Sequence, residues 1–161
     1  MAKGFKLAIA AAVLAMTASV SAPVVGAGAD ESIKMRVDLM KAGIGKPFGA
    51  IKAYIEKGQG TAEDAAKNAM TLSESAKKIA GMFPKGSGRD EIDPKMTRAL
   101  PSIWTQWSGF ESAANALSAE SAKLATVIKG GDMGAIKAQY AAVGKNGCGA
   151  CHKNYRGDKV K

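Results

Sequence analysis

A five-residue motif near the C-terminus constrains this chain more than any other part of its sequence. Cys148-Gly149-Ala150-Cys151-His152 contains the only two cysteines and the only histidine among 161 residues. The pattern C-x-x-C-H is the attachment sequence of a c-type haem. The thiols lie about one helical turn apart, so both can add to vinyl groups on one porphyrin edge. We expect one covalent haem c per chain, attached through Cys148 and Cys151, with His152 binding the iron.

Three other kinds of site use paired cysteines. A disulfide between Cys148 and Cys151 would suit an oxidising compartment, but it accounts for neither the histidine nor its position. A thioredoxin-like redox pair normally accompanies a βαβ pattern, which this sequence lacks. A structural zinc ion needs four ligands, whereas cysteine and histidine together supply three. Haem attachment is the interpretation that uses all three residues.

The N-terminus has the order of segments that is typical of a secretory signal peptide. A basic start precedes an apolar run over residues 7–20, and small residues follow. We expect residues 1–29 to be a cleavable signal peptide, with cleavage after Ala29 or, alternatively, after Ala27. A retained membrane anchor is the other interpretation, but the run is shorter than the roughly 20 apolar residues of a spanning helix. The mature domain, residues 30–161, would then lie in the periplasm.

Export has a consequence for the cysteines. Paired cysteines in an oxidising compartment normally form disulfides. Haem attachment requires reduced thiols, so the interpretation implies a dedicated haem maturation machinery.

Basic residues outnumber acidic ones, 23 to 14, which gives the chain a formal charge of +9. The predicted signal peptide removes two lysines, which leaves 21 basic side chains and a formal charge of +7. This excess favours acidic partners or membrane surfaces. Nucleic acid is not expected as a partner, because the lysines are scattered along the chain instead of clustered.

Apolar residues recur every three or four positions in four segments of the mature chain, which predicts four amphipathic helices and no strands. We expect these helices over residues 30–57, 61–83, 102–129 and 132–156. Gly43, Gly45 and Pro47 should bend the first helix, since an internal proline costs about 3 kcal/mol. One long connection, residues 84–101, separates the second helix from the third.

Two helix starts are marked by capping residues. Thr61 followed by Asp64 resembles a capping box with aspartate in the usual glutamate place. Asp132 is an N-cap candidate for the last helix. Four helices that each have an apolar face predict an all-α fold, an antiparallel four-helix bundle with the haem motif near the end of the last helix. Gly147 and the glycines beside it should let a macrocycle lie close to the backbone.

Over the whole mature chain, the sequence resembles the class II c-type cytochromes, the family that includes cytochrome c′. The position of the haem motif is distinctive, because small class I cytochromes c carry it near their N-terminus. The matching motifs are Ile33-x-x-Arg36-x-x-x-Met40-Lys41 in the first helix, Ile103-Trp104 followed by Phe110 in the third, and Cys148-x-x-Cys151-His152-x-x-Tyr155-Arg156 in the last.

The resemblance implies roles for individual residues. His152 would be the proximal iron ligand, and the two cysteines of the motif would carry the thioethers. Arg36 would pair with a haem propionate, to which a guanidinium can donate two hydrogen bonds. Arg98 is a weaker propionate candidate. Arg156, one turn beyond His152, would lie near the proximal face of the haem.

The predicted function depends on Met40. A methionine at an apolar helical position usually fills the core, but the resemblance implies that this position faces the open side of the iron. With Met40 as sixth ligand opposite His152, the protein would be a low-spin periplasmic electron carrier and not an enzyme. With the site empty, it would be a five-coordinate cytochrome c′ that binds nitric oxide or carbon monoxide. Met35, Met70 and Met82 are rival thioethers, but none fits the motif.

A peroxidase-like enzyme is a third interpretation. It needs a distal acid–base group, and the only histidine is already assigned to the proximal side. The electron-carrier interpretation implies redox partner proteins in the periplasm, which should be acidic because the chain is basic. Related proteins include monomers and homodimers packed through the first two helices, so both states stay open.

Overall fold

The computed structural model describes residues 28–160; residues 1–27, with most of the predicted signal peptide, and residue 161 lie outside the described residues. Residues 28–160 contain helices and no named strand, and one isolated β-bridge joins Ala99 to Arg156. Within this part of the chain, no helix is both long and apolar enough to cross a membrane. Cleavage after Ala29 stays a prediction, and Ala29 is the first residue of the first helix.

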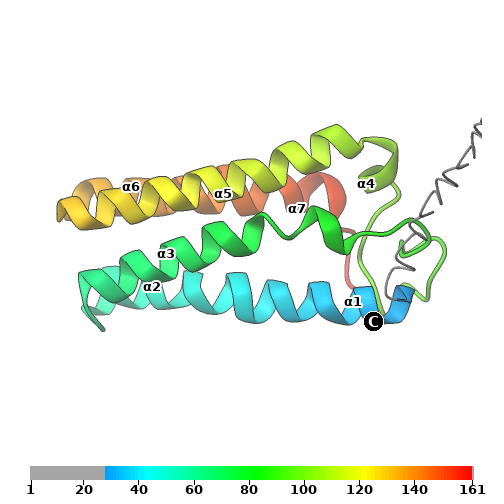
Figure 1. Cartoon of the computed structure of the whole chain (residues 1–161), viewed down its shortest axis with the longest axis horizontal. Coiled ribbons are helices and arrows are strands. Elements are labelled where there is room, and N and C mark those ends of the chain that lie inside the picture. Colours follow the sequence, from blue (N-terminus) through cyan, green and yellow to red (C-terminus); the bar gives the residue numbers. More distant parts are fainter. Residues whose placement is uncertain (1–27, 161) are drawn as a thin grey trace, which may run out of the picture.

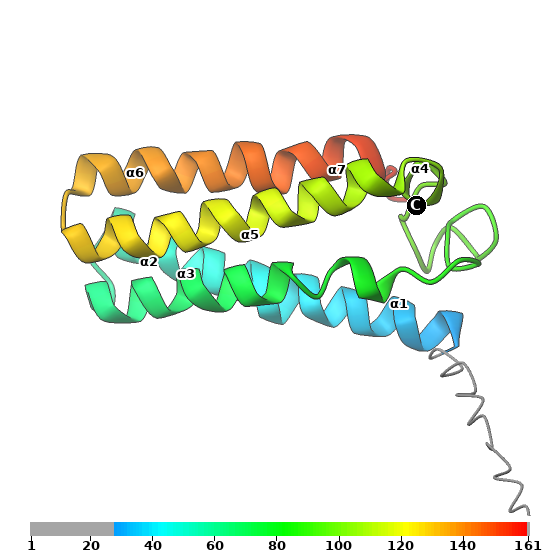
Figure 2. The same cartoon turned by 45° about the horizontal axis from the view of Figure 1, so that its top comes forward.

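The helices form a four-helix bundle in which successive long helical segments run in opposite directions (Figures 1 and 2). This confirms the fold predicted from the sequence. The first segment comprises α1 (Ala29–Asp38), the π-helix η1 (Leu39–Gly45) and α2 (Lys46–Lys57), and the second is α3 (Ala62–Ala76). The third comprises α4 (Ser102–Thr105) and α5 (Trp107–Gly130), and the fourth α6 (Met133–Ala142), the π-helix η3 (Val143–Gly149) and α7 (Ala150–Tyr155).

Capping residues and glycines set several of the helix ends. Thr61 and Asp64 form a complete capping box, and the Asp132 carboxylate accepts hydrogen bonds from two backbone N–H groups of α6. Gly58 (φ 63°) ends α2 and Gly131 (φ 79°) ends α5, both in the left-handed conformation that favours glycine. These local signals place the two short turns at one end of the bundle (Figure 1).

The first helix differs from the prediction at Pro47. Instead of a bend, the chain continues from α1 to α2 through the π-helix η1 (Figure 1). A wider turn relieves the clash between a proline ring and the carbonyl four residues earlier. Gly43 within η1 lies against α3, where a Cβ would come within 2.8 Å of the Ser75 hydroxyl. The glycine therefore serves close helix packing.

The second helix is shorter than predicted, and the third is interrupted near its start. α3 ends at Ala76, and a 3₁₀ turn (η2, Ala80–Met82) leads into the long connection. Gln106, with φ −125° and ψ 45°, separates α4 from α5. Tertiary contacts hold both breaks in place: the Trp104 indole N–H donates to the Phe83 carbonyl oxygen at 3.0 Å.

The core lies between α3, α5 and the helices beside them. α3 packs against α2 and α5, and α5 packs against α6 and η3. The alanine-rich face of α3 is buried here and serves helix packing. The largest side chains with almost no exposed surface are Ile51, Leu72, Ile79, Ile103, Phe110, Leu124, Ile128, Ile136 and Val143.

Candidate haem site

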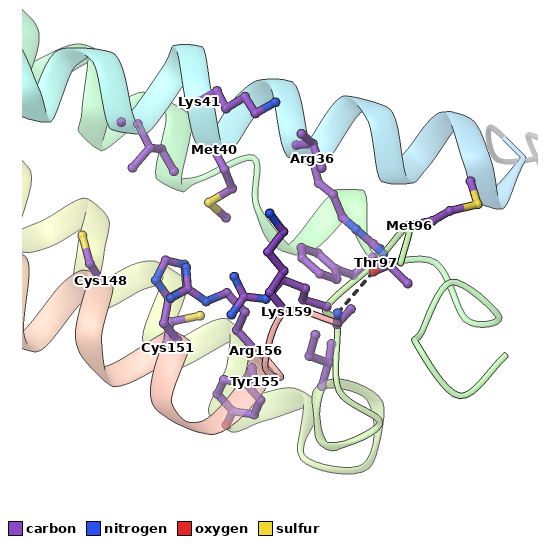
Figure 3. A pocket seen from close by; sticks show the side chains of 18 of the residues that line it. Arg36, Met40, Lys41, Met96, Thr97, Cys148, Cys151, Tyr155, Arg156 and Lys159 are labelled. Carbon is purple, nitrogen blue, oxygen red and sulfur yellow. Dashed lines mark hydrogen bonds between the residues drawn. The ribbon is translucent and has the colours of Figure 1, made fainter. Parts of the chain in front are cut away.

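A cavity of about 780 Å³ opens between the first and last helices of the bundle. Its volume lies within the roughly 300–1,000 Å³ that is usual for small-molecule and cofactor sites. The C-terminal half of α1 and η1 form one wall, and η3 with α7 forms the opposite wall (Figure 3). Residues 94–99 of the long connection and the C-terminal tail border the opening.

All three residues of the haem motif line this cavity. Cys148 lies in η3, whereas Cys151 and His152 lie in α7. Both cysteines are free thiols. Burial raises the pKa of Cys148, and burial together with the neighbouring Cys148 raises that of Cys151 to about 11. Both groups therefore remain thiols at neutral pH, which disfavours disulfide exchange through a thiolate.

The His152 imidazole is in the form that a metal needs. Burial lowers the pKa of His152, and the nearby positive charges of Arg156 and Arg98 lower it further. The neutral imidazole is the metal-binding form. Within residues 28–160, no side chain or backbone group hydrogen-bonds to its ring. One ring nitrogen is thus available to iron.

Met40 lies on the wall opposite the motif. Its side chain is half-buried and extends from η1 toward the wall that carries Cys148 and Cys151 (Figure 3). A second, wholly apolar pocket of about 20 Å³ is bordered by Met40, His152 and both cysteines. Ile79 and Leu117 close it from inside the bundle. The structure thus brings together the two expected axial residues on one interior space.

Arg36 also lines the cavity, and its hydrogen bonds go to residues of the long connection. Its guanidinium donates to the Ser87 hydroxyl at 2.9 Å, the Ser87 carbonyl at 2.7 Å and the Thr97 hydroxyl. It also stacks over the Phe83 ring, 4.6 Å from the centroid. Arg36 is 5% exposed, and burial lowers its pKa to about 10. It therefore fastens the long connection to α1, a role that the sequence analysis did not anticipate.

The buried guanidinium has no carboxylate partner in the described part of the chain, where the ion pairs join Lys34–Asp38, Lys52–Glu56 and Lys77–Glu74. Two of its five N–H groups remain after the three hydrogen bonds. A buried cation is stabilised by an anion. A propionate at the cavity would supply one, so the expected role of Arg36 is compatible with its structural role.

Positive charge dominates the whole cavity. Six basic residues line it, and no aspartate or glutamate among residues 28–160 does; the six are Arg36, Lys41, Lys95, Arg98, Arg156 and Lys159. Arg98 is held in place because its Nε donates to the Gly157 carbonyl at 2.7 Å. Arg156 is exposed at the end of α7, on the wall that also carries His152.

The glycines around the motif also take part in helix packing. A Cβ on Gly147 would lie 2.7 Å from Leu117 Cδ1 and 3.0 Å from its Cα. A Cβ on Gly144 would contact the Phe48 ring at 3.6 Å. Gly147 therefore lets η3 pack closely against α5, and it also borders the small pocket beside Cys148 and His152. That these glycines let a macrocycle lie close to the backbone stays a prediction.

The sequence did not indicate several residues that belong to the site. Lys95 and Lys159 come from irregular segments without periodicity, so no pattern indicated that they border the cavity. Phe48 lines the cavity and stacks on Tyr140, with ring centroids 4.2 Å apart. The Tyr140 hydroxyl donates to the Phe48 carbonyl at 3.4 Å, and burial raises the pKa of Tyr140 to about 12. The positions of Phe48 and Tyr140 in the sequence indicate a ring contact only when the two helices that carry them are known to be neighbours.

The residues present fit a haem. The cavity interior is apolar, with Ile44, Phe48 and Phe110 on its walls, as a porphyrin ring requires. The two thiols and a neutral imidazole lie on one wall. The cationic opening suits the two carboxylates of a haem, which would offset the otherwise unbalanced positive charge.

Comparisons with known proteins agree with this site. The model of the cytochrome c′ family matches residues 31–156. Cytochrome c-556 of Agrobacterium tumefaciens (strain II Chrys) is 34% identical over 126 residues, which cover 77% of this chain and 95% of that protein. Cytochrome c′ of Rubrivivax gelatinosus is 32% identical over 116 residues, which cover 70% of this chain and 84% of the relative.

A solved structure has the same fold. The crystal structure of cytochrome c′ from Thermochromatium tepidum superposes with a TM-score of 0.70 at 26% identity, covering 82% of this chain and 98% of that one. Family, fold and cavity therefore agree. The chain belongs to the cytochrome c′ family of class II cytochromes c, whose members bind one covalently attached haem c per chain.

Proposed function

We propose that this protein is a periplasmic one-electron carrier whose haem iron is ligated by His152 and Met40. The proposal rests on the observation that Met40 and His152 line the same cavity from opposite walls. The rival methionines are less suitable. Met35 and Met70 are 44% and 42% exposed, and neither they nor Met82 line the cavity. Met96 does line it, but at the opening and 49% exposed.

Each residue of the site has a defined task in this proposal. Cys148 and Cys151 hold the haem covalently, and the bound haem supplies the Fe(III)/Fe(II) couple. Methionine ligation opposite histidine raises the reduction potential. Arg36 and Arg156 balance the propionate charge. The protein's contribution is to fix the ligands in an apolar interior, so that little rearranges when an electron arrives.

The alternative is a five-coordinate cytochrome c′ that binds nitric oxide or carbon monoxide. One observation favours it: the wall around Met40 is apolar, with Ile44 and Phe48 beside it, which admits neutral diatomic ligands. A nitric oxide complex is known for an Alcaligenes xylosoxidans cytochrome c′ variant with the same fold. A peroxidase is not supported, because the cavity wall around Met40 has no histidine or carboxylate among the described residues to move protons.

The assembly and the location belong to the same proposal. A cytochrome c′ with this fold forms a dimer whose dissociation is controlled by ligand. Here the exposed thioethers Met35 and Met70 lie on α1 and α3, the helices through which a homodimer would pack. Periplasmic location rests on the predicted signal peptide.

The deciding experiment is the spectrum of the purified ferric haem protein at neutral pH. Ligation by Met40 predicts a low-spin spectrum with a thioether-to-iron charge-transfer band. Met40→Ala should convert the spectrum to high-spin and open the ferrous iron to carbon monoxide, whereas the control Met70→Ala should change neither. A high-spin spectrum of the unmodified protein would refute Met40 ligation and favour the gas-binding alternative.

A further inference from the structure

The opening of the haem cavity combines exposed cations with exposed apolar side chains. Among residues 28–160, six large apolar side chains are strongly exposed, and three of them border this cavity: Val37, Met96 and Val160, at 37%, 49% and 36% exposure. The basic residues around them are Lys41, Lys95, Arg98, Arg156 and Lys159. We call these eight residues the mouth surface. Exposed apolar groups with a charged rim are typical of protein interaction sites.

The charge of the mouth surface exceeds what the haem requires. Six cations line the cavity when Arg36 is included, and two propionates would offset two of them, which leaves about four. Three carboxylates lie within three residues of these cations in sequence, Asp38, Asp93 and Asp158, and none of them lines the cavity. Asp38 pairs with Lys34 at 2.7 Å, and Asp93 accepts a hydrogen bond from the backbone N–H of Lys95. The opening therefore keeps a positive potential after haem attachment.

The mouth surface is built from three segments that are tied together. The backbone N–H of Gly157 donates to the Arg98 carbonyl at 2.8 Å, and that of Leu100 donates to the Tyr155 carbonyl at 3.1 Å. The β-bridge between Ala99 and Arg156 lies between them. Arg36 holds the same connection to α1 through Thr97. The C-terminal tail and the connection thus present their cations from a common framework, as a preorganised docking site requires.

We propose that the mouth surface is the docking site for an acidic redox protein. This inference rests on the proposed electron-carrier function and assigns its partner and point of contact. Carboxylates around the partner's redox centre would face the lysines, and the apolar side chains would exclude water at the centre of contact. One electron then passes from the reduced partner to ferric iron, which becomes ferrous, and no bond or proton moves.

An anionic membrane is the other macromolecule that such charges could bind. Interfacial membrane binding uses a continuous amphipathic helix that lies flat on the bilayer. Here the cations come from η1, a loop and the tail, and no continuous helix carries them. This arrangement suits a protein partner better than attachment to lipid through such a helix.

Binding is measured first without electron transfer. The oxidised haem protein is titrated by calorimetry with oxidised flavodoxin, a strongly acidic redox protein, at low ionic strength. Lys41→Glu with Lys159→Glu should weaken binding roughly tenfold or more, since reversing charges in an electrostatically steered interface opposes association. The matched control, Lys67→Glu with Lys137→Glu, makes the same change in net charge on α3 and α6, away from the cavity, and should leave the affinity nearly unchanged.

A second readout separates charge from apolar contact. Reduced flavodoxin should reduce the ferric protein at a rate that falls as the salt concentration increases. Met96→Ser should slow this reaction severalfold. The same variant should leave the rate of electron transfer with ferrocyanide unchanged, because ferrocyanide carries charge but has no apolar face. Equal weakening by the control pair, no binding, or preference for anionic phosphatidylglycerol vesicles over flavodoxin would each overturn the proposal. The spin state and reversible reduction by dithionite test the electron-carrier function separately.

Discussion

Replacing Arg36 by methionine should release the long connection from α1 and lower the free energy of unfolding by about 2–4 kcal/mol. The estimate follows from its three hydrogen bonds, to the Ser87 hydroxyl, the Ser87 carbonyl and the Thr97 hydroxyl, because a hydrogen bond to a charged group contributes about 1.5–3 kcal/mol. All three bonds are lost, and the removed desolvation cost of the buried guanidinium offsets much of that loss.

A double-mutant cycle isolates the contact. Thr97→Val removes the hydroxyl that Arg36 contacts, and it also removes the acceptor for the backbone N–H of Ala99, 3.2 Å away. The latter loss cancels in the cycle. We expect a coupling energy of about 1–2 kcal/mol between Arg36→Met and Thr97→Val. The assay is urea unfolding of the haem protein, followed by far-ultraviolet circular dichroism.

Two outcomes discriminate between the roles of Arg36. If the two substitutions add independently, the guanidinium does not hold the connection, and the reasoning fails. A propionate role has its own signature: Arg36→Met would shift the reduction potential of the haem, whereas Thr97→Val would not. The exposed Lys34→Met, two residues earlier on α1, is the control for a simple loss of positive charge.

Three further predictions test the motif helix and its surroundings. Gly147→Ala should destabilise the protein by up to about 2 kcal/mol, because overpacking against Leu117 exceeds the gain in helix propensity. Gly49→Ala is the control: nothing lies within 4 Å of its added Cβ, so it should stabilise the protein by about 0.5–1 kcal/mol. A thermal melt in which both variants gain stability would contradict the close contact at Gly147. The pKa of Tyr140 is about 12 in the folded protein and about 10 in the unfolded chain. Its contribution to stability is therefore present below pH 10 and is lost as the pH rises toward 12. A tyrosinate absorbance titration should show a late component that disappears in Tyr140→Phe. Cys148→Ser combined with Cys151→Ser should abolish haem staining on a denaturing gel, and retained stain would disprove attachment through these residues.

Much of the fold could be predicted because its signals are local. Thr61 and Asp64 form their capping box within four residues, and Gly58 and Gly131 end helices through their own backbone conformation. The three- and four-residue spacing of apolar side chains then predicts which face each helix buries. The prediction failed where distant contacts override such signals, as at Gln106 and after Ala76, where the chain leaves the helix despite a continuing apolar pattern.

Arg36 shows why the site could be predicted only in part. Its place in a motif indicated the cavity, and the structure puts it there. Its hydrogen-bond partners Ser87 and Thr97 lie 51 and 61 residues away in a segment without periodicity. No spacing rule connects such residues, so its role in holding the connection depends on the folded arrangement alone.

The sequence by itself determined the cofactor, because C-x-x-C-H is a local pattern whose chemistry needs only adjacent residues. It also determined the four-helix fold, since periodicity along each helix specifies which side must be buried. Only the tertiary structure decided that Met40 and His152 share one cavity, that Gly147 serves packing against Leu117, and that cations from three segments surround the opening. The physical reason is that contacts across the bundle depend on how the helices are oriented and tied together, which no single segment encodes.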